Sequence, residues 1–145
     1  MTKKHQGDDL GTRMKRYEST SKTFLMRRTP VIARIDGRAF HTFTKRLPRP
    51  TDVPFSDVMH KCMVYTMQQL VDNVQGCVLG YTQSDEITLV LTDFDTLSTD
   101  AWFNGEVQKI VSVSASLAAA RFNQLRMCRL QSFDIKLAFF DSRCF

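Results

Sequence analysis

The feature of this chain that most restricts its fold is the alternation of four β-forming runs with two long stretches of helical periodicity. Alternating and β-branched residues predict strands over 31–35, 77–81, 87–91 and 133–139. Apolar side chains recur at steps of three and four in 54–76 and in 100–125, as they do in amphipathic helices. Right-handed crossovers leave few arrangements for this βαββαβ order. We therefore predict an α+β, ferredoxin-like fold, an antiparallel sheet with two helices on one face.

The second and third predicted strands are separated only by residues 82–86, which is the length of a hairpin connection. They should therefore be antiparallel neighbours. In a ferredoxin-like sheet the first and third strands lie side by side at the centre. Polymerase palms share this layout with RNA-recognition motifs and many small-molecule domains, so the fold alone does not predict the chemistry.

Residues 1–29 are expected to form a basic helical segment ahead of a catalytic domain at 30–145. Leu10, Met14 and Tyr17 follow a helical spacing, and Asp8 or Asp9 could cap the helix. Much of the basic charge lies in this segment, in a chain with a net charge of +5 and a pI near 9.2. A polyanion would be attracted to it, which predicts an arm that faces RNA or phosphate.

Composition excludes several other classes of protein. Apolar residues make up 43% and charged residues 24%, as in ordinary globular domains rather than disordered or fibrous chains. The four cysteines show no CxxC spacing, so neither a zinc site nor a disulfide framework is predicted. No apolar run approaches bilayer length. We expect a cytoplasmic protein with no membrane partner.

Two acidic residues are the strongest candidates for catalysis. Asp36 ends the first predicted strand and Asp85 lies in the hairpin between the second and third, so the two should meet at one edge of the sheet. Carboxylates placed together repel unless cations bridge them, and Mg²⁺ is typically held by one or two carboxylates plus substrate phosphates. With two Mg²⁺ ions, one would activate an attacking hydroxyl and the other would hold a triphosphate.

Neighbouring residues suggest supporting roles. Glu86 follows Asp85 and would point to the other face of an extended backbone, so we assign it the orientation of a basic residue. From spacing alone, Ser84-Asp85-Glu86 could equally be a polar hairpin tip. The backbone N–H groups that follow Gly37 could cradle phosphates. In that loop Phe40 could instead plug the core, and His41 could donate to a phosphate oxygen.

Two long motifs, residues 34–43 and 81–86, closely resemble the tRNA-His guanylyltransferase family, with further matches at 49–52, 108–112 and 140–143. The resemblance covers nearly the whole chain. It implies a polymerase-like palm that adds nucleotides in the 3′–5′ direction to the 5′ end of tRNA, after ATP has activated the 5′ phosphate. The implied substrates are tRNA, ATP and GTP or another nucleoside triphosphate.

The resemblance also implies individual roles. By motif, Asp36, the Gly37 carbonyl and Asp85 resemble the Mg²⁺ ligands. The triphosphate site resembles the loop of Arg38, Ala39, Phe40 and His41 together with Ser84 and Lys109. Arg49 and Asp52 resemble residues of the activation nucleotide site, although Arg49 stands where a lysine is often found and a guanidinium is not an equivalent point charge.

Members of the family continue beyond the position of Phe145 into helices that contribute to oligomerisation and tRNA binding. We therefore expect the full-length protein to be a dimer or tetramer, and we leave open a chain that binds nucleotide without measurable turnover. The second helix and the 140–143 motif look closer to the Thg1-like subgroup, whose members tend to repair 5′-truncated tRNAs, so the resemblance implies 5′-end repair rather than dedicated tRNA-His guanylylation. The sequence does not indicate which tRNA or which nucleotide is preferred.

Two alternatives remain. A non-catalytic RNA-binding module could have the same βαββαβ order, but an RNA-recognition motif needs an aromatic run on a central strand, and residues 86–91 contain none. A nucleotidyl cyclase also uses a palm with two aspartates and Mg²⁺. It would form a cyclic product from ATP or GTP without RNA.

Overall fold

The computed structural model describes residues 9–44, 57–130 and 136–145. Within these ranges one four-stranded antiparallel sheet has the order β2-β3-β1-β4. Its strands are β1 (Val31–Gly37), β2 (Cys77–Gln83), β3 (Glu86–Leu91) and β4 (Phe140–Cys144). The hairpin pairing of β2 with β3 and the central position of β1 beside β3 are confirmed.

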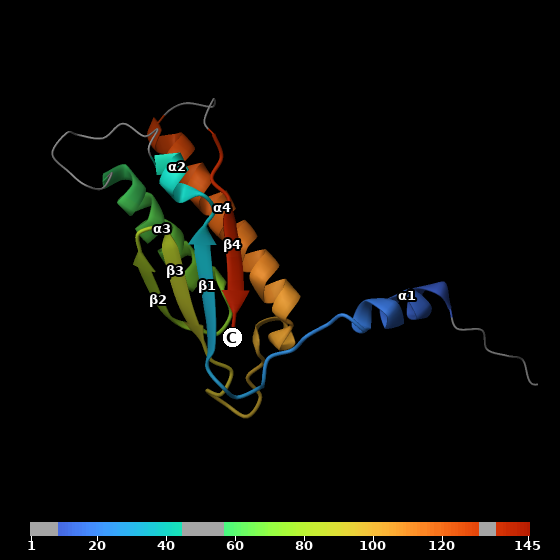
Figure 1. The fold of residues 1–145 in the computed structure, drawn as a ribbon. Coiled ribbons are helices and arrows are strands. Elements are labelled where there is room, and N and C mark those ends of the chain that lie inside the picture. Colours follow the sequence, from blue (N-terminus) through green and yellow to red (C-terminus); the bar gives the residue numbers. More distant parts are fainter. Residues whose placement is uncertain (1–8, 45–56, 131–135) are drawn as a thin grey trace, which may run out of the picture.

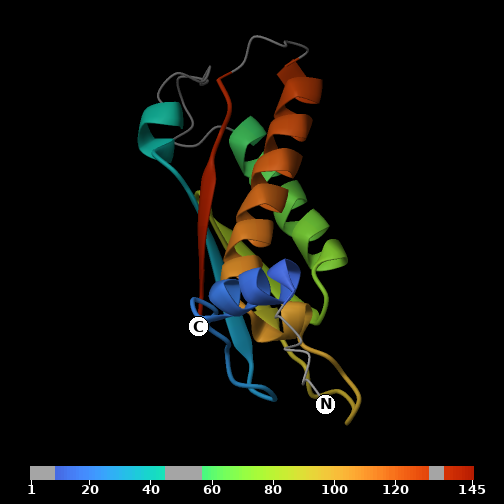
Figure 2. The same cartoon turned by 90° about the vertical axis from the view of Figure 1, so that its right-hand side faces the viewer.

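The two long helices are α3 (Asp57–Asn73) and α4 (Val107–Leu130), and both cover the same face of the sheet (Figures 1 and 2). A short helix α2 (Phe40–Thr44) follows β1, and the 3-10 turn η1 (Trp102–Gly105) precedes α4. This arrangement confirms the ferredoxin-like prediction. Among the residues described, no helix combines the length and apolarity that a bilayer crossing requires.

Strand alternation decides which face of the sheet is covered. Ala33 and Ile35 of β1 and Ile87 and Leu89 of β3 are fully buried under the helices, where Phe122 of α4 meets them. The residues between them lie on the opposite face, because successive side chains of a strand point to opposite sides. One face is therefore the core, and the helices leave the other face uncovered.

The fourth strand was predicted at 133–139 and this was wrong. β4 begins at Phe140, and residues 136–139 form no strand, while 131–135 lie outside the described residues. Ala138 instead exchanges two hydrogen bonds with the side chain of Asn123 on α4, at 2.9 and 2.8 Å. The reason is that β1 ends at Gly37 and the chain then turns into α2, so no partner strand is available before Phe140.

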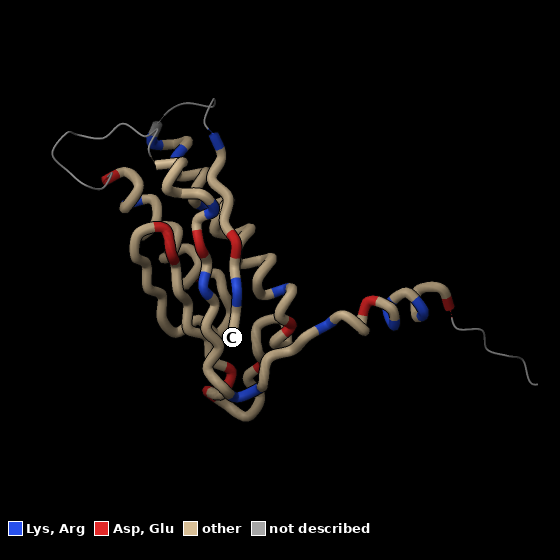
Figure 3. Tube along the Cα trace, in the orientation of Figure 1, with Lys and Arg blue, Asp and Glu red and all other residues tan. Residues whose placement is uncertain are grey.

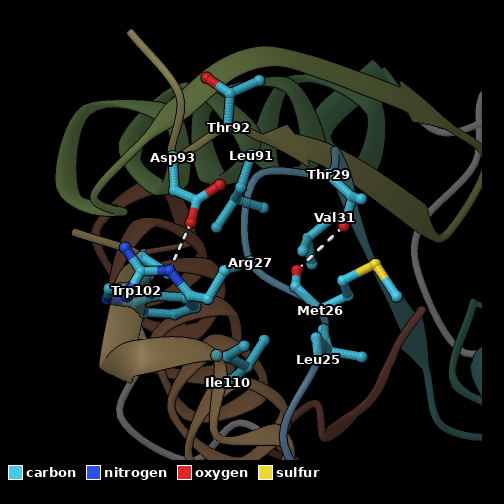
Figure 4. A pocket seen from close by; sticks show the side chains of 12 residues that line it. Leu25, Met26, Arg27, Thr29, Val31, Leu91, Thr92, Asp93, Trp102 and Ile110 are labelled. Carbon is cyan, nitrogen blue, oxygen red and sulfur yellow. Dashed lines mark hydrogen bonds and ion pairs between the residues drawn. The ribbon is translucent and has the colours of Figure 1, made fainter. Parts of the chain in front are cut away.

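The N-terminal helix α1 (Leu10–Ser19) buries none of its residues and extends away from the sheet and helices (Figures 1 and 3). The segment after it returns to the body, where Phe24 forms an isolated bridge with Glu106. Arg27 then fastens the segment by donating through Nε to Asp93 Oδ2 at 2.6 Å, beside a small cavity of about 20 Å³ (Figure 4). The residues that follow α1 are thus attached to the body, whereas α1 itself buries none of its residues.

Asp93 should make stability depend on pH in the acid range. Its carboxylate is buried and accepts bonds from Arg27 Nε and the Arg28 N–H, which hold the pKa of Asp93 below its usual range. A lowered folded-state pKa contributes stability above the unfolded pKa, near 3.8, and that stability is lost as pH falls through the folded value.

We therefore expect Asp93→Asn to lower the Tm at pH 7 and to flatten its decline in acid. Thermal unfolding followed by circular dichroism from pH 7 to pH 2.5 measures both effects. Asp72→Asn, on an exposed part of α3, is the matched control. Parallel pH profiles for Asp93→Asn and wild type would contradict the assignment.

Candidate active site

The two predicted aspartates lie at the same edge of the sheet. Asp36 sits near the end of β1, and Asp85 lies in the two-residue turn that joins β2 to β3. The Gly37 N–H donates to the Asp85 carbonyl oxygen at 3.0 Å, which ties the strand end to the turn. Sequence positions almost fifty residues apart are therefore adjacent in the fold.

Strand register adds two more carboxylates. Asp36 is directly opposite Glu86 on one side and Asp141 on the other. Opposed residues of antiparallel strands share a face, and Asp36 is on the face that the helices leave open. We call Glu86, Asp36 and Asp141 the acidic row. Glu86 thus shares the face of Asp36, because Asp85 belongs to the turn rather than to the extended strand.

Within the acidic row, the repulsion between carboxylates acts on Asp36. The pKa of Asp36 is raised, first by burial and then by the negative charges of Asp85, Asp141 and Glu86, while Arg143 acts in the opposite direction. A group whose ionised form is disfavoured in this way gains from a bound cation. The charge distribution therefore favours occupation by a metal ion, by the same logic as the sequence argument.

A second row lies two residues further along each strand. Arg34 and Arg143 are directly opposite one another, although like charges in that arrangement repel. Each is paired with a member of the acidic row: Arg34 Nη2 contacts Glu86 Oε1, and Arg143 Nη2 lies 3.5 Å from Asp141 Oδ1. Glu86 thus contacts a basic side chain, and the orientation of a basic residue is the role that we predicted for Glu86.

The loop after β1 has less free backbone than the sequence suggested. The N–H groups of Gly37 and Arg38 already donate, to the carbonyl oxygens of Asp85 and Phe139. Ala39 adopts a left-handed φ of 56° and starts α2, whose first-turn N–H groups lack acceptors within the helix. Any cradle for phosphate would therefore use the backbone from Ala39 to His41.

Phe40 is a core residue in this structure. It is 3% exposed, and its ring lies 5.1 Å from that of Phe140 and 5.5 Å from that of Phe122 between centroids. A methyl group on Gly37 would clash with the Phe40 ring, so the glycine permits this packing. Phe40 can support a nucleotide site only through its backbone, whereas the side chain of His41 is exposed.

Ser84 occupies the other tight turn of the site. It has a left-handed φ of 57°, and its Oγ donates to Asp85 Oδ1 at 3.0 Å. Backbone strain of this kind in residues other than glycine costs about 1–3 kcal/mol and persists where the surroundings enforce it. Both motifs of the site, at Ala39 and at Ser84, contain such a residue.

Lys109 is not brought to this edge. It lies in the first turn of α4, 3.6 Å from Glu106 and next to Phe103. Ile110 beside it lines the same cavity as Val31, the first residue of β1, which is the end of the strand furthest from Asp36. Arg49 and Asp52 lie outside the described residues.

Sequence reasoning gave too little weight to Asp141. Aspartates at strand ends are common, and Asp141 falls beyond the end of the strand predicted at 133–139. The alternation of Asp141 and Arg143 with Phe140, Ser142 and Cys144 was the available signal. It would have placed both charged residues on the open face.

The residues present fit Mg²⁺ in a sparse site. Within 9–44, 57–130 and 136–145, no three His, Cys, Asp or Glu residues converge as a ready-made metal cluster. Mg²⁺ does not require one, since it commonly keeps waters and uses one or two carboxylates with substrate phosphates. Asp36 and Asp85, with the Gly37 carbonyl, are the groups that would hold it.

Comparison with known proteins now identifies the family. The model of the tRNAHis guanylyltransferase family, Thg1, matches residues 11–145. The chain belongs to the tRNA-His guanylyltransferase family. Among its relatives, the tRNA(His) guanylyltransferase of Schizosaccharomyces pombe is 32% identical over 111 residues, which are 75% of this chain and 38% of that protein.

Solved structures of this family agree with the fold. A bacterial tRNA(His) guanylyltransferase (Thg1)-like protein in complex with ATP matches with a TM-score of 0.85 and 43% identity, over 95% of this chain and 58% of that one. A complex of such a bacterial protein with GTP matches with a TM-score of 0.84 and 43% identity, over 93% and 62%. The Saccharomyces cerevisiae enzyme, at 24% identity and a TM-score of 0.69, shares the fold over 89% and 56%.

The chain thus spans about two fifths of the curated guanylyltransferase from Schizosaccharomyces pombe and about three fifths of the bacterial structures. The part that it does span includes the open face of the sheet and both motifs at the edge where Asp36 and Asp85 meet, which we call the acidic edge.

Proposed function

We propose that this chain supplies the Mg²⁺-dependent nucleotide site of a nucleotidyltransferase that extends tRNA at its 5′ end in the 3′–5′ direction. The observation that carries the proposal is the meeting of Asp36 and Asp85 at one edge of the sheet, where burial and then neighbouring carboxylates raise the pKa of Asp36. Family membership and the ATP and GTP complexes of bacterial relatives support it.

The residues at this edge of the sheet have separate roles in the proposal. Asp36 and Asp85 would hold Mg²⁺, which would supply positive charge to polyphosphate oxygens and favour deprotonation of an attacking hydroxyl. We assign the orientation of phosphates to the backbone of residues 39–41, which follows Gly37, and to the hydroxyl of Ser84, which donates to Asp85 Oδ1. Glu86 holds Arg34 on the open face, where a guanidinium suits an RNA phosphate.

The substrate scheme has two steps. ATP first activates the 5′ monophosphate of tRNA with release of pyrophosphate. The 3′-hydroxyl of a second nucleoside triphosphate then attacks the activated phosphate and AMP leaves. We favour 5′-end repair as the biological task, in a cytoplasmic protein that assembles as a dimer or tetramer when full-length.

The test supplies 5′-truncated, 5′-phosphorylated tRNA with ATP, Mg²⁺ and each nucleoside triphosphate in turn, and measures products on a denaturing gel. Mg²⁺-dependent GTP binding is measured alongside by calorimetry. We expect extension of the RNA and loss of both signals in EDTA. Nucleotide binding that ignores Mg²⁺ would contradict the proposal, and cyclic product formed without RNA would identify a cyclase instead.

A further inference from the structure

The net positive charge of this protein is confined to one segment. Residues 1–29 contain 8 Lys or Arg against 3 Asp or Glu, which equals the net charge of +5 of the whole chain. Residues 30–145 contain 12 of each sign and are formally neutral. Taken as a whole, residues 30–145 therefore add no net charge that would attract a polyanion.

The cations at the base of this segment are already paired with the body. Lys22 lies 3.6 Å from Glu106, and Arg27 contacts Asp93. Both acids are buried, so these two pairs serve attachment. Arg13 and Lys15 of α1, in contrast, have no acidic partner among the described residues.

The position of α1 leaves those cations accessible. None of its residues is buried, and the helix, with the Lys and Arg positions along it, extends away from the body (Figure 3). Tyr17 is 61% exposed and Leu10 62%, at a helical spacing that places both next to Arg13 on one face. An exposed aromatic ring beside a guanidinium suits RNA, which offers phosphates and base or ribose surfaces together.

We propose that α1 is an RNA-docking arm that contacts tRNA phosphates through Arg13 and Lys15, at a distance from the acidic edge. The proposal rests on the proposed function for the identity of the RNA. The arm supplies the electrostatic attraction that the neutral body lacks, and the acidic edge then acts on a 5′ end that is already tethered.

The test compares wild type with Arg13→Gln/Lys15→Gln by fluorescence anisotropy of labelled tRNA at 50–200 mM salt. EDTA is present and nucleotide is absent, so the readout is independent of the acidic edge. Each lost phosphate contact should lower the salt slope of log K by about one, so we expect a decrease of about two and roughly tenfold weaker binding. GTP binding with Mg²⁺ should be unchanged.

The matched control is Lys61→Gln/Arg129→Gln, which removes two exposed cations from the helix layer. An equal loss of tRNA binding in this control would overturn the proposal, because it would show that tRNA affinity depends on total charge and not on the position of the cations in α1. Unchanged salt slopes in the arm variant would also overturn it. Sedimentation of Leu10→Ser/Tyr17→Ser is a further test. If this variant loses a self-association that the wild type shows, while it still binds RNA, the proposal is overturned, because α1 would then dock on a second copy.

Failure of the proposed function has a different signature. A wild-type chain that binds tRNA through α1, but neither binds GTP with Mg²⁺ nor extends RNA, would support the role of α1 in RNA docking and contradict the proposed nucleotidyltransferase activity. Because α1 packs on nothing in the body, the Tm of the arm variant should equal that of wild type.

Discussion

Asp36→Asn should abolish nucleotide addition and, at the same time, make the metal-free protein more stable. The amide removes one of two carboxylates from a site with few protein ligands, and loss of a single group that stabilises developing charge costs about 10²–10³-fold or more in rate. The gain in stability has the same origin, since the ionised Asp36 is disfavoured by burial and by Asp85, Asp141 and Glu86.

The sign can be checked by linkage. Because the pKa of Asp36 is higher in the folded state than in the unfolded chain, its destabilising effect is absent at low pH. The effect appears as pH rises through the folded-state pKa and persists at neutral pH. Metal-free Asp36→Asn should therefore melt at a higher temperature than wild type at pH 7.

Thermal unfolding with EDTA and with Mg²⁺ and GTP, alongside the addition assay, measures both effects. Wild type should be stabilised by Mg²⁺ and GTP, whereas Asp36→Asn should respond weakly. Asp72→Asn, on α3 away from the edge, should behave as wild type in every assay. A destabilised, metal-free Asp36→Asn would contradict the assigned repulsion.

Phe40→Ala is expected to lower the free energy of unfolding by about 3–5 kcal/mol, the usual cost of truncating a buried phenylalanine. The ring is 3% exposed and contacts three other phenylalanines, Phe43, Phe122 and Phe140. It anchors the loop that follows Asp36 to α4 and β4. Nucleotide binding should weaken as well, because the backbone of residues 39–41 would lose its support.

Gly37→Ala tests the same contact from the other side. A methyl group would clash with the Phe40 ring, and overpacking of this kind costs about 1–3 kcal/mol. In the Phe40→Ala background the same methyl should be tolerated, so the two changes should be strongly non-additive. Urea unfolding of both single variants and the double variant measures the coupling. Additive losses would show that the ring does not restrict Gly37.

Much of the site could be predicted because local patterns determine it. The period-two runs gave β1, β2 and β3, and the hairpin length between β2 and β3 placed Asp85 near the edge where β1 delivers Asp36. Helical spacing in 54–76 and 100–125 predicted α3 and α4, although the turn η1 occupies the start of the second range and α4 continues to Leu130. Each of these inferences needs only neighbouring residues and the handedness of crossovers.

The fourth strand could not be placed in this way. Leu137 and Phe139 alternate as strand residues do, yet a strand exists only where a partner offers hydrogen bonds, and β1 has already ended at Gly37. The same long-range fact places Asp141 beside Asp36. For Lys109 the helix was predicted, but the sequence did not predict that this residue lies at the end of the sheet away from Asp36.

By itself, then, the sequence determined the order of elements, the two motifs and the concentration of positive charge in residues 1–29, because these depend on residue type and spacing along the chain. Only the tertiary structure decided which carboxylates share a face, which phenylalanine is a core residue and that α1 stands apart from the body. Those outcomes depend on strand register and packing between segments far apart in sequence, and no local pattern encodes them.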